Sequence, residues 1–354
     1  MTVFHTARRV PTNSCILLSS PEEARAYPTG DIQLAFCADC GFISNVAFDP
    51  GLTEYSARYE ETQGYSPTFN AFHRALAERL IERYDLHDKD VIEIGCGKGE
   101  FLMLLCELGG NRGIGFDPGV HVARIQGPAA DRVQFIADFY SDKYADHRGD
   151  FVACKMTLEH IHPTGDFIGT LRRAIGDRVG TDVFFQIPES TRIVRDCAFE
   201  DIYYEHCSYF SPGSLARLFR RSGFEVVSLD TEYASQYLTI EARAAEMPVR
   251  QPPLPAEDDI AVLAGYTQTF PDRLPRSSTT GGCCLAASPM KENGLLCGGQ
   301  APRQSPSSRP WARQRVSWSA GLISTPTARV TTCLALGFRS SARGSLRPTG
   351  RTRW

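Results

Sequence analysis

The chain has 354 residues, a formal net charge of −3 and twelve cysteines. It contains no apolar run of the roughly 18 residues that a transmembrane helix requires, and Arg8 and Arg9 are not followed by the apolar stretch of a signal peptide. We therefore expect a cytoplasmic protein without membrane partners, whose cysteines are mostly free thiols.

The charge is divided unevenly along the chain. Residues 274–354 carry eleven Arg, one Lys and one acidic residue, a net charge of +11, so the preceding part carries −14. Binding to nucleic acid requires Lys and Arg against the phosphates. An acidic body predicts a small-molecule substrate and no nucleic acid.

Taken in chain order, the sequence predicts an N-terminal region at 1–75 and an α/β domain at 76–246. Residues 72–84 have helical apolar spacing, and strands then alternate with helices, which predicts a mostly parallel sheet covered on both faces. Residues 224–244 read as two strands around a short turn, which would add an antiparallel edge.

The C-terminal part changes in composition. Residues 247–273 read as a Pro-rich linker followed by a possible helix, and residues 274–354 form a tail dominated by Ser, Arg, Pro and Gly. Such a tail is typical of disorder. A basic arm for nucleic acid and a frame-shifted translation of a GC-rich gene are the alternatives.

The stretch "VIEIGCGKGEF" (residues 91–101) is the strongest motif. Gly95, Gly97 and Gly99 lie between a predicted strand and a predicted helix, where glycines allow a tight turn and the helix N-terminus offers free N–H groups. The spacing differs from the G-x-G-x-x-G of dinucleotide binders. Glu93 would repel a pyrophosphate but would attract the ammonium of an amino-acid moiety.

Two further acids end the next strands. Asp117, in "GIGFDPG", is placed to accept hydrogen bonds from both ribose hydroxyls. Asp138, in "FIADFY", is placed to accept from an adenine amino group, with Phe139 beside the ring.

With these motifs in this order, residues 88–244 strongly resemble class I S-adenosylmethionine-dependent methyltransferases. The resemblance implies a Rossmann-like seven-stranded sheet with an antiparallel last strand and S-adenosylmethionine as cofactor. A Rossmann-like domain that binds a dinucleotide is the alternative.

"IYYEHCSYF" and "LAFCADCGF" further resemble C-methyltransferases that carry a small N-terminal zinc-binding domain and act on carbon of deoxysugars and related intermediates. That group has a Tyr-x-Glu-His motif, which matches Tyr203, Glu205 and His206 here. The His of the motif is the group's general base, a role that the resemblance carries over to His206. A second active-site His of the group matches His160 in "TLEHIH".

The residue types suit proton abstraction next to a carbonyl. Such a carbon must lose a proton before it attacks the sulfonium methyl, which needs a base that titrates near neutrality and donors for the enolate. Glu205 could orient His206 or raise its basicity. Each His could instead be a core residue, and His162 competes with His160 for its role.

Aromatic residues before the domain are expected to close over the cofactor, as in similar enzymes, or to pack between domains. Tyr59 is chosen from a group that also includes Tyr55 and Tyr65.

Cys37 and Cys40 resemble one half of a structural zinc site, which needs four ligands. The similar proteins have a second pair upstream, whereas this chain offers His5 and Cys15. Either the N-terminus is shortened relative to the family or this region stands without metal. The similar proteins also have a C-terminal α/β domain, which the composition of 274–354 does not match.

The resulting hypothesis is an S-adenosylmethionine-dependent methyltransferase that methylates carbon of a small sugar-like or ketone-like intermediate, with His206 as general base. O- or N-methylation of a sugar or natural product and non-catalytic cofactor binding are the alternatives.

Overall fold

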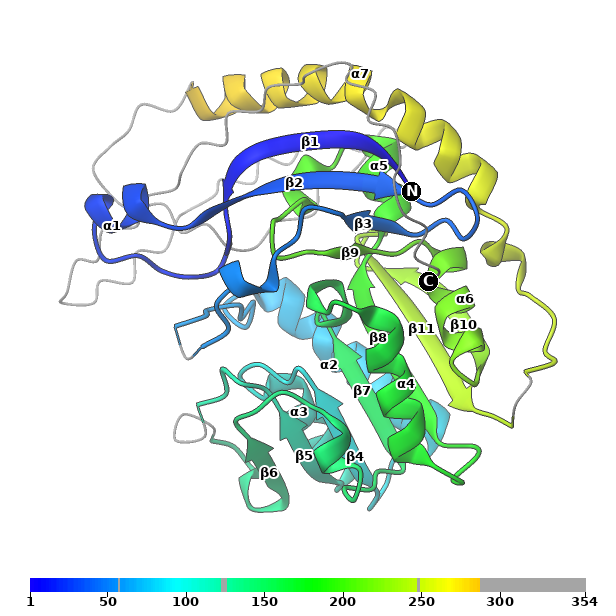
Figure 1. The fold of residues 1–354 in the computed structure, drawn as a ribbon. Helices are drawn as coiled ribbons and strands as arrows, with labels where there is room; N and C mark the ends of the chain where they lie inside the picture. Colours follow the sequence, from blue (N-terminus) through cyan, green and yellow to red (C-terminus); the bar gives the residue numbers. More distant parts are fainter. Residues whose placement is uncertain (57, 122–125, 247–248, 287–354) are drawn as a thin grey trace, which may run out of the picture.

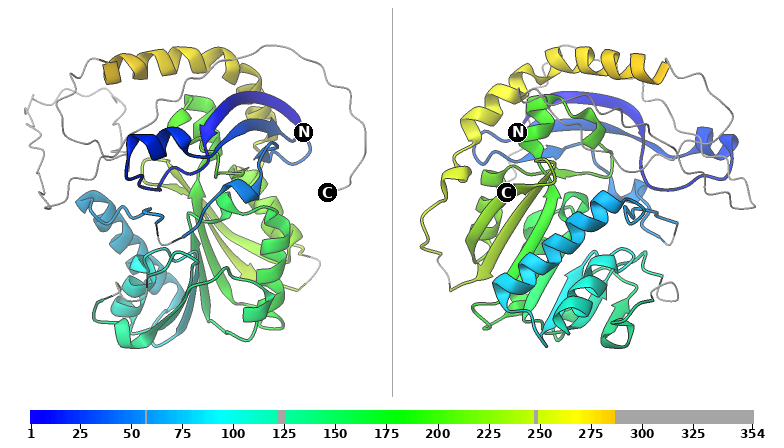
Figure 2. Two further views of the ribbon diagram at one scale, coloured as in Figure 1. Left: turned by 60° about the vertical axis from the view of Figure 1, so that its left-hand side comes forward. Right: turned by 180° about the vertical axis from the view of Figure 1, so that it is seen from behind.

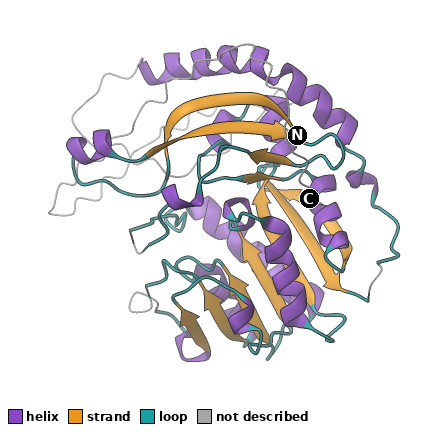
Figure 3. Ribbon diagram, viewed as in Figure 1, coloured by secondary structure: helices purple, strands orange, loops and turns teal. Residues whose placement is uncertain are grey.

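The computed structural model describes residues 1–286 apart from residues 57, 122–125 and 247–248. The structure contains two sheets, and the smaller one lies beyond one end of the larger one, above it in the view of Figure 1. Figure 3 shows the helices lying outside both sheets.

The larger sheet has seven strands in the order β10-β11-β8-β7-β4-β5-β6. Its strands are β4 (Asp90–Ile94), β5 (Arg112–Phe116), β6 (Val133–Ile136), β7 (Phe151–Lys155), β8 (Asp182–Pro188), β10 (Phe224–Glu232) and β11 (Tyr237–Ala244). All neighbouring pairs from β6 to β8 are parallel, while β11 is antiparallel to both β8 and β10. In this order β11, the last strand in the chain, is the antiparallel one, which confirms the fold class predicted from the sequence.

Helices cover both faces of this sheet because its central strands are apolar on both sides. One face packs on α2 (Pro67–Tyr84) and α3 (Glu100–Gly109), through Leu76, Leu80, Phe101 and Leu105. The other face packs on α4 (Thr164–Ile175) and α6 (Pro212–Arg221). The right-hand view of Figure 2 shows α2 crossing its face of the sheet diagonally.

Helix α2 begins earlier than the apolar spacing predicted. Ser66 caps its N-terminus by accepting the N–H of Phe69, and Pro67 occupies the first turn. Pro suits that position because its missing N–H would have no partner there. The cap therefore adds a turn that apolar periodicity does not reveal.

The smaller sheet has four strands in the order β1-β2-β3-β9 and is antiparallel. Its strands are β1 (Thr2–Pro11), β2 (Thr29–Phe36), β3 (Ile43–Asn45) and β9 (Ser208–Tyr209). Since β9 comes from the C-terminal half of the chain, the N-terminal region at 1–75 is completed by a segment more than 130 residues beyond it. The segment that precedes β9 is thereby fixed between the two sheets.

Two helices cover the smaller sheet, α5 (Ser190–Asp196) and α7 (Ile260–Ala286), and a short α1 (Pro21–Ala26) lies at its end. Short 3-10 helices connect the elements: η1 (Pro50–Leu52), η3 (Ala130–Arg132), η4 (Asp142–Tyr144), η5 (Leu158–His160), η6 (Phe199–Asp201) and η7 (Pro255–Glu257). Helix α7 lies along β1 in Figure 1 and buries Leu263 and Phe270 there.

The predicted boundary at residue 273 is corrected by α7, which continues to Ala286. Residues 275–286 are rich in Ser, Thr and Gly and have no apolar periodicity from which a helix could be predicted. The disorder and the frame shift predicted for the rest of the tail fall on residues 287–354, outside the described residues.

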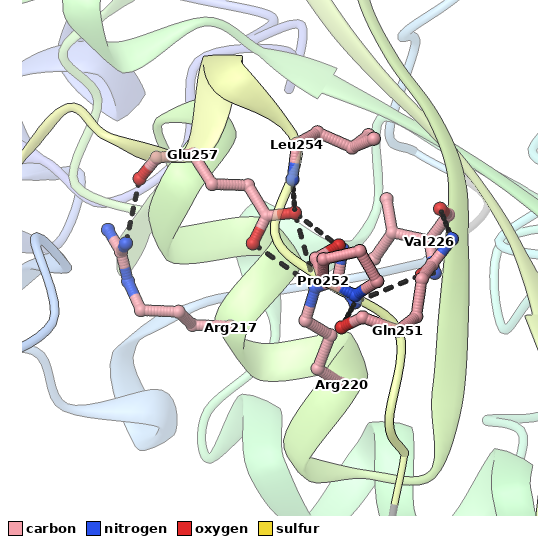
Figure 4. Close-up of polar contacts among 7 residues, drawn as sticks. All are labelled: Arg217, Arg220, Val226, Gln251, Pro252, Leu254 and Glu257. Carbon is pink, nitrogen blue, oxygen red and sulfur yellow. Dashed lines mark hydrogen bonds and ion pairs between the residues drawn. The ribbon is translucent and has the colours of Figure 1, made fainter.

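The Pro-rich linker is anchored rather than free where it is described. Glu257 is 4% exposed and accepts hydrogen bonds from Arg220, while its carbonyl accepts from Arg217 (Figure 4). Gln251 pairs with both the N–H and the carbonyl of Val226, at 2.9 and 2.8 Å. These contacts hold the start of α7 against α6.

Candidate active site

The glycine loop connects β4 to α3 at the C-terminal edge of the large sheet. Gly95, Gly97 and Gly99 have φ angles of +71°, +52° and +78°, which L side chains rarely adopt. A Cβ on Gly95 would lie 1.9 Å from Oγ1 of Thr157. The loop therefore requires glycine, and it leaves the first N–H groups of α3 facing the edge where ligands bind in such sheets.

Asp117 follows β5 and faces this loop. Its Oδ2 accepts the N–H of Gly97 at 3.0 Å and its Oδ1 accepts the N–H of Gly119 at 2.7 Å. Burial raises the pKa of Asp117, and these two N–H donors oppose that shift. Each oxygen keeps a lone pair, so the carboxylate can accept two ligand hydroxyls as well.

Glu93 lies on β4 directly below the loop and is 2% exposed. Its Oε2 has no hydrogen-bond partner among the described residues. Burial raises the pKa of Glu93, while the charge of Lys155 opposes the shift. A buried acceptor without a donor suits a ligand ammonium.

Asp138 and Phe139 lie just after the end of β6. The carboxylate of Asp138 already accepts from Lys143, from the Tyr144 hydroxyl at 2.7 Å and from the N–H of Phe139 at 2.8 Å. These donors lower the pKa of Asp138. Phe139 is 60% exposed, which leaves its ring free to contact an adenine.

A segment before α2 covers the loop. Nζ of Lys98 donates to the carbonyl of Tyr59 at 2.8 Å, and Tyr59 forms an isolated β-bridge with Ile16. The Tyr55 hydroxyl lies 3.0 Å from Nδ1 of His160, whereas Tyr65 is 89% exposed. Of the three candidate tyrosines, Tyr55 and Tyr59 face the site and Tyr65 faces solvent.

The two predicted histidines come together although 46 positions separate them in the sequence. The rings of His160 and His206 lie edge to face with centroids 4.8 Å apart, and the Tyr203 ring lies 4.9 Å from His206. Burial lowers the pKa of His160, and the negative charge of Asp117 is among the effects that oppose this shift, so the cluster is within electrostatic reach of the cofactor loop. The structure thus places the predicted base next to the predicted cofactor site.

His206 is 7% exposed, and burial moves its pKa well below the usual range. Its Nδ1 lies 3.3 Å from the carbonyl oxygen of Asp201. Since a carbonyl only accepts, Nδ1 carries the proton and Nε2 keeps a lone pair. His206 is therefore neutral at pH 7, with one nitrogen able to accept a proton.

Glu205 does not bond to His206. Its carboxylate accepts from Nδ2 of Asn13 at 2.8 Å and from the N–H of Ser14 at 2.9 Å. The suggestion that Glu205 orients His206 is corrected on this point: the carbonyl of Asp201 takes that place. Glu205 instead fixes the N-terminal strand region over the site, because a buried carboxylate requires donors.

The sequence reasoning missed Glu159, although it stands beside His160 in the quoted motif. Glu159 is 2% exposed, and neither carboxylate oxygen has a hydrogen-bond partner among the described residues. One ligand atom from each of Glu159, His160 and His206 lies within 4.8 Å of the others. Its position between a predicted buried strand and a candidate catalytic His could have identified Glu159 from the sequence.

The zinc prediction for Cys37 and Cys40 stays a prediction. Both thiols are free, and the metal-like cluster named above is the one group of its kind among the described residues. Cys15 lies near Glu205, and His5 contacts the Phe270 ring at 5.4 Å. The residues that might have supplied the missing ligands are thus engaged elsewhere.

Comparison with known proteins shows which family this part of the chain resembles. Residues 68–229 match the family model described as a methyltransferase domain. The chain is 30% identical over 167 residues to the C-methyltransferase NovU of Streptomyces niveus, which covers 45% of this chain and 38% of NovU. The match thus spans well under half of that relative's length.

Solved structures with a similar fold include two methyltransferases. RosA of Streptomyces davawensis, an N,N-8-amino-8-demethyl-D-riboflavin dimethyltransferase, is 16% identical with a TM-score of 0.41, covering 50% of this chain and 56% of RosA. The 1,6-didemethyltoxoflavin-N1-methyltransferase of Burkholderia thailandensis is 18% identical with a TM-score of 0.39, covering 52% and 83%. Among the residues that the structure describes, no helix is long and apolar enough to cross a bilayer.

Proposed function

We propose that this chain, whose residues 68–229 form a class I S-adenosylmethionine-dependent methyltransferase domain, transfers the methyl group to a carbon atom of a small biosynthetic intermediate. The acceptor carbon lies next to a carbonyl, and His206 is the general base.

The loop region supports S-adenosylmethionine as the cofactor. Asp117 would accept the ribose hydroxyls while it holds Gly97 and Gly119. The free Oε2 of Glu93 would accept the ammonium of the methionine moiety. An anion at that position disfavours a pyrophosphate, which speaks against a dinucleotide.

The observation that carries the choice of base is the tautomer and burial of His206. A neutral imidazole with its Nδ1 proton held by the carbonyl of Asp201 presents a lone pair on Nε2. Burial keeps His206 unprotonated at neutral pH. Burial also raises the pKa of Tyr203 above its ordinary value, so its hydroxyl stays protonated and can donate to a developing oxyanion.

The reaction follows from these groups. His206 takes the proton of the C–H bond, and the electron pair moves toward the carbonyl oxygen as an enolate. S-adenosylmethionine, held by Glu93 and Asp117, would supply the methyl group from its sulfonium, so that the new C–C bond would form as the C–S bond breaks and a neutral thioether would remain. Alignment of the two reactants over the loop supplies much of the rate.

The acceptor is proposed to be a keto-sugar or a related ketone, because a carbon next to a carbonyl can lose a proton to a neutral imidazole. The test is incubation with S-adenosylmethionine carrying a ¹³C methyl group and a panel of such ketones, with ¹³C NMR of the product. A new methyl signal on carbon is expected. A methyl on oxygen or nitrogen would contradict carbon methylation, and cofactor binding without turnover on any acceptor would favour a non-catalytic protein.

A further inference from the structure

Buried carboxylates need partners, and Glu159 lacks them. Taking a carboxylate out of water costs several kcal/mol unless donors or a counter-charge compensate. No other described residue donates a hydrogen bond to either oxygen of Glu159, and its own backbone N–H is the one group that lowers its pKa. The side chain nevertheless reaches the two active-site imidazoles. Such an orphan group at a reaction centre calls for a function.

The imidazole of His206, close to Glu159, needs a negative counter-charge when it takes up a proton. A His206 that accepts a proton becomes a buried cation, and its surroundings disfavour that form. The nearby His160 adds to this, because a protonated His160 ring would repel the imidazolium. The carboxylate oxygens of Glu205 are occupied by Asn13 and Ser14.

We propose that Glu159 is a positioning residue that supplies the negative counter-charge for the imidazolium formed at His206 during proton abstraction. The inference rests on the proposed function, because it concerns the same base. At separations up to 4.8 Å, the attraction between two unit charges is worth several kcal/mol in a partly buried site. It therefore offsets the cost that burial places on protonated His206.

This role makes catalysis depend on the ionisation of Glu159. Burial raises the pKa of Glu159 to about 8, and the charge of Glu205 acts in the same direction. The other titratable groups that interact with Glu159 are Tyr55, Cys154, Cys207 and Tyr237. Burial raises the pKa of each of these four, so they stay neutral across the relevant range. The rate of the wild-type chain should then rise with pH up to about 8.

A divalent cation is the competing occupant, because two imidazoles and a carboxylate are metal-ligating groups. The contacts disfavour it. Nδ1 of His160 is engaged by the Tyr55 hydroxyl at 3.0 Å, and the ring also makes a hydrogen bond to the backbone of Glu205. Nδ1 of His206 faces a carbonyl. The counter-charge requires no rearrangement, whereas a metal would require His160 to give up a partner.

The experiment compares kcat from pH 6 to 9 for the wild type, Glu159→Gln and Glu159→Asp, in EDTA, with the acceptor found in the ketone panel. Glu225→Gln, on the exposed side of β10, is the matched control. Glu159→Gln is expected to lower kcat about 10- to 100-fold at pH 8.5 with little effect at pH 6.5, and KM for S-adenosylmethionine should stay unchanged. Glu159→Asp keeps the charge and should keep the rise with pH.

If Glu159 only filled space, Glu159→Asp would lose more activity than Glu159→Gln, since Gln has the shape of Glu and Asp does not. Tolerance of Gln with loss in Asp would therefore overturn the proposal, and so would a pH profile unchanged in Glu159→Gln. A stoichiometric metal that is lost together with activity in Glu159→Gln would replace the counter-charge by a metal site. Absence of turnover in the wild type would remove the proposed function itself, and with it this inference.

Discussion

The Oδ2 atom of Asp117 accepts the backbone N–H of Gly97 at 3.0 Å, which ties the acid after β5 to the glycine loop after β4. The parallel pairing of these two strands brings the groups together. One carboxylate therefore shapes the loop and is also available to the cofactor. This double use makes its substitutions informative.

Asp117→Asn is expected to weaken the binding of S-adenosylmethionine about 10- to 100-fold, because a charge-assisted acceptor for the ribose becomes a neutral amide. Asp117→Ala should lose more, since Gly97 and Gly119 then also lose their acceptor. Calorimetric titration with S-adenosylmethionine and S-adenosylhomocysteine measures both. Asp90→Asn, at the far end of β4, is the control, and an equal loss there would contradict a local role.

His206→Gln is expected to lower kcat by at least about 100-fold while the affinity for S-adenosylmethionine changes less than about twofold. The reason is that Gln offers no base, while the cofactor loop lies on other elements. His162→Gln, from the neighbouring position that competes in the sequence, should keep its activity. If His162→Gln were the inactive variant, the assignment of the base would have to change.

The pH dependence of stability should report the two buried titratable groups with opposite signs. The pKa of His206 falls below its ordinary 6.5 on folding, so the unfolded chain binds more protons below that pH. Stability from this group is complete above about pH 6.5 and falls as the pH drops, by up to about 1.4 kcal/mol per pH unit. His206→Gln should flatten this acidic slope in urea unfolding experiments.

Glu159 acts in the other direction. Its pKa rises from 4.5 to about 8 on folding, so the folded chain holds the extra proton between those values. The contribution of Glu159 to the free energy of unfolding is complete below about pH 4.5 and is lost as the pH rises toward 8. Glu159→Gln should therefore gain stability relative to the wild type as the pH increases. A constant difference between the two chains from pH 5 to 8 would contradict the shift.

Gly95→Ala is expected to destabilise the chain by at least about 2 kcal/mol and to abolish cofactor binding. The added Cβ meets Thr157 in a backbone conformation with φ of +71°. Gly165→Ala in α4 is the matched control, since a Cβ there has no heavy atom within 4 Å. That change should be neutral or slightly stabilising in thermal unfolding. Equal effects at the two positions would argue against a strained loop.

Arg220→Met is expected to destabilise the anchored linker by about 3 kcal/mol, because it leaves the buried carboxylate of Glu257 without its main donor. Urea unfolding measures the loss. The exposed neighbour Arg221→Met should change stability by less than about 0.5 kcal/mol. Similar values for both variants would show that the linker does not depend on this ion pair.

The sequence by itself determined the large sheet and its cofactor loop. The strands around Glu93, Asp117 and Asp138 are short, apolar and bounded by turns, and they alternate with helices, so these strands and their parallel pairing could be predicted from local patterns. Three glycines between a strand and a helix likewise predict the loop. These features depend on neighbours in the chain, which is why they are readable without a structure.

The tertiary structure alone decided how the base is surrounded. That β9 joins the N-terminal sheet depends on a pairing of residues far apart in the chain, and no local pattern encodes it. For the same reason Glu205 turned out to hold Asn13 and Ser14, and Asp201 to hold His206. Burial is likewise a property of the packed chain. It left Glu159 without partners beside two imidazoles, and so shifted the pKa values on which the proposed chemistry depends.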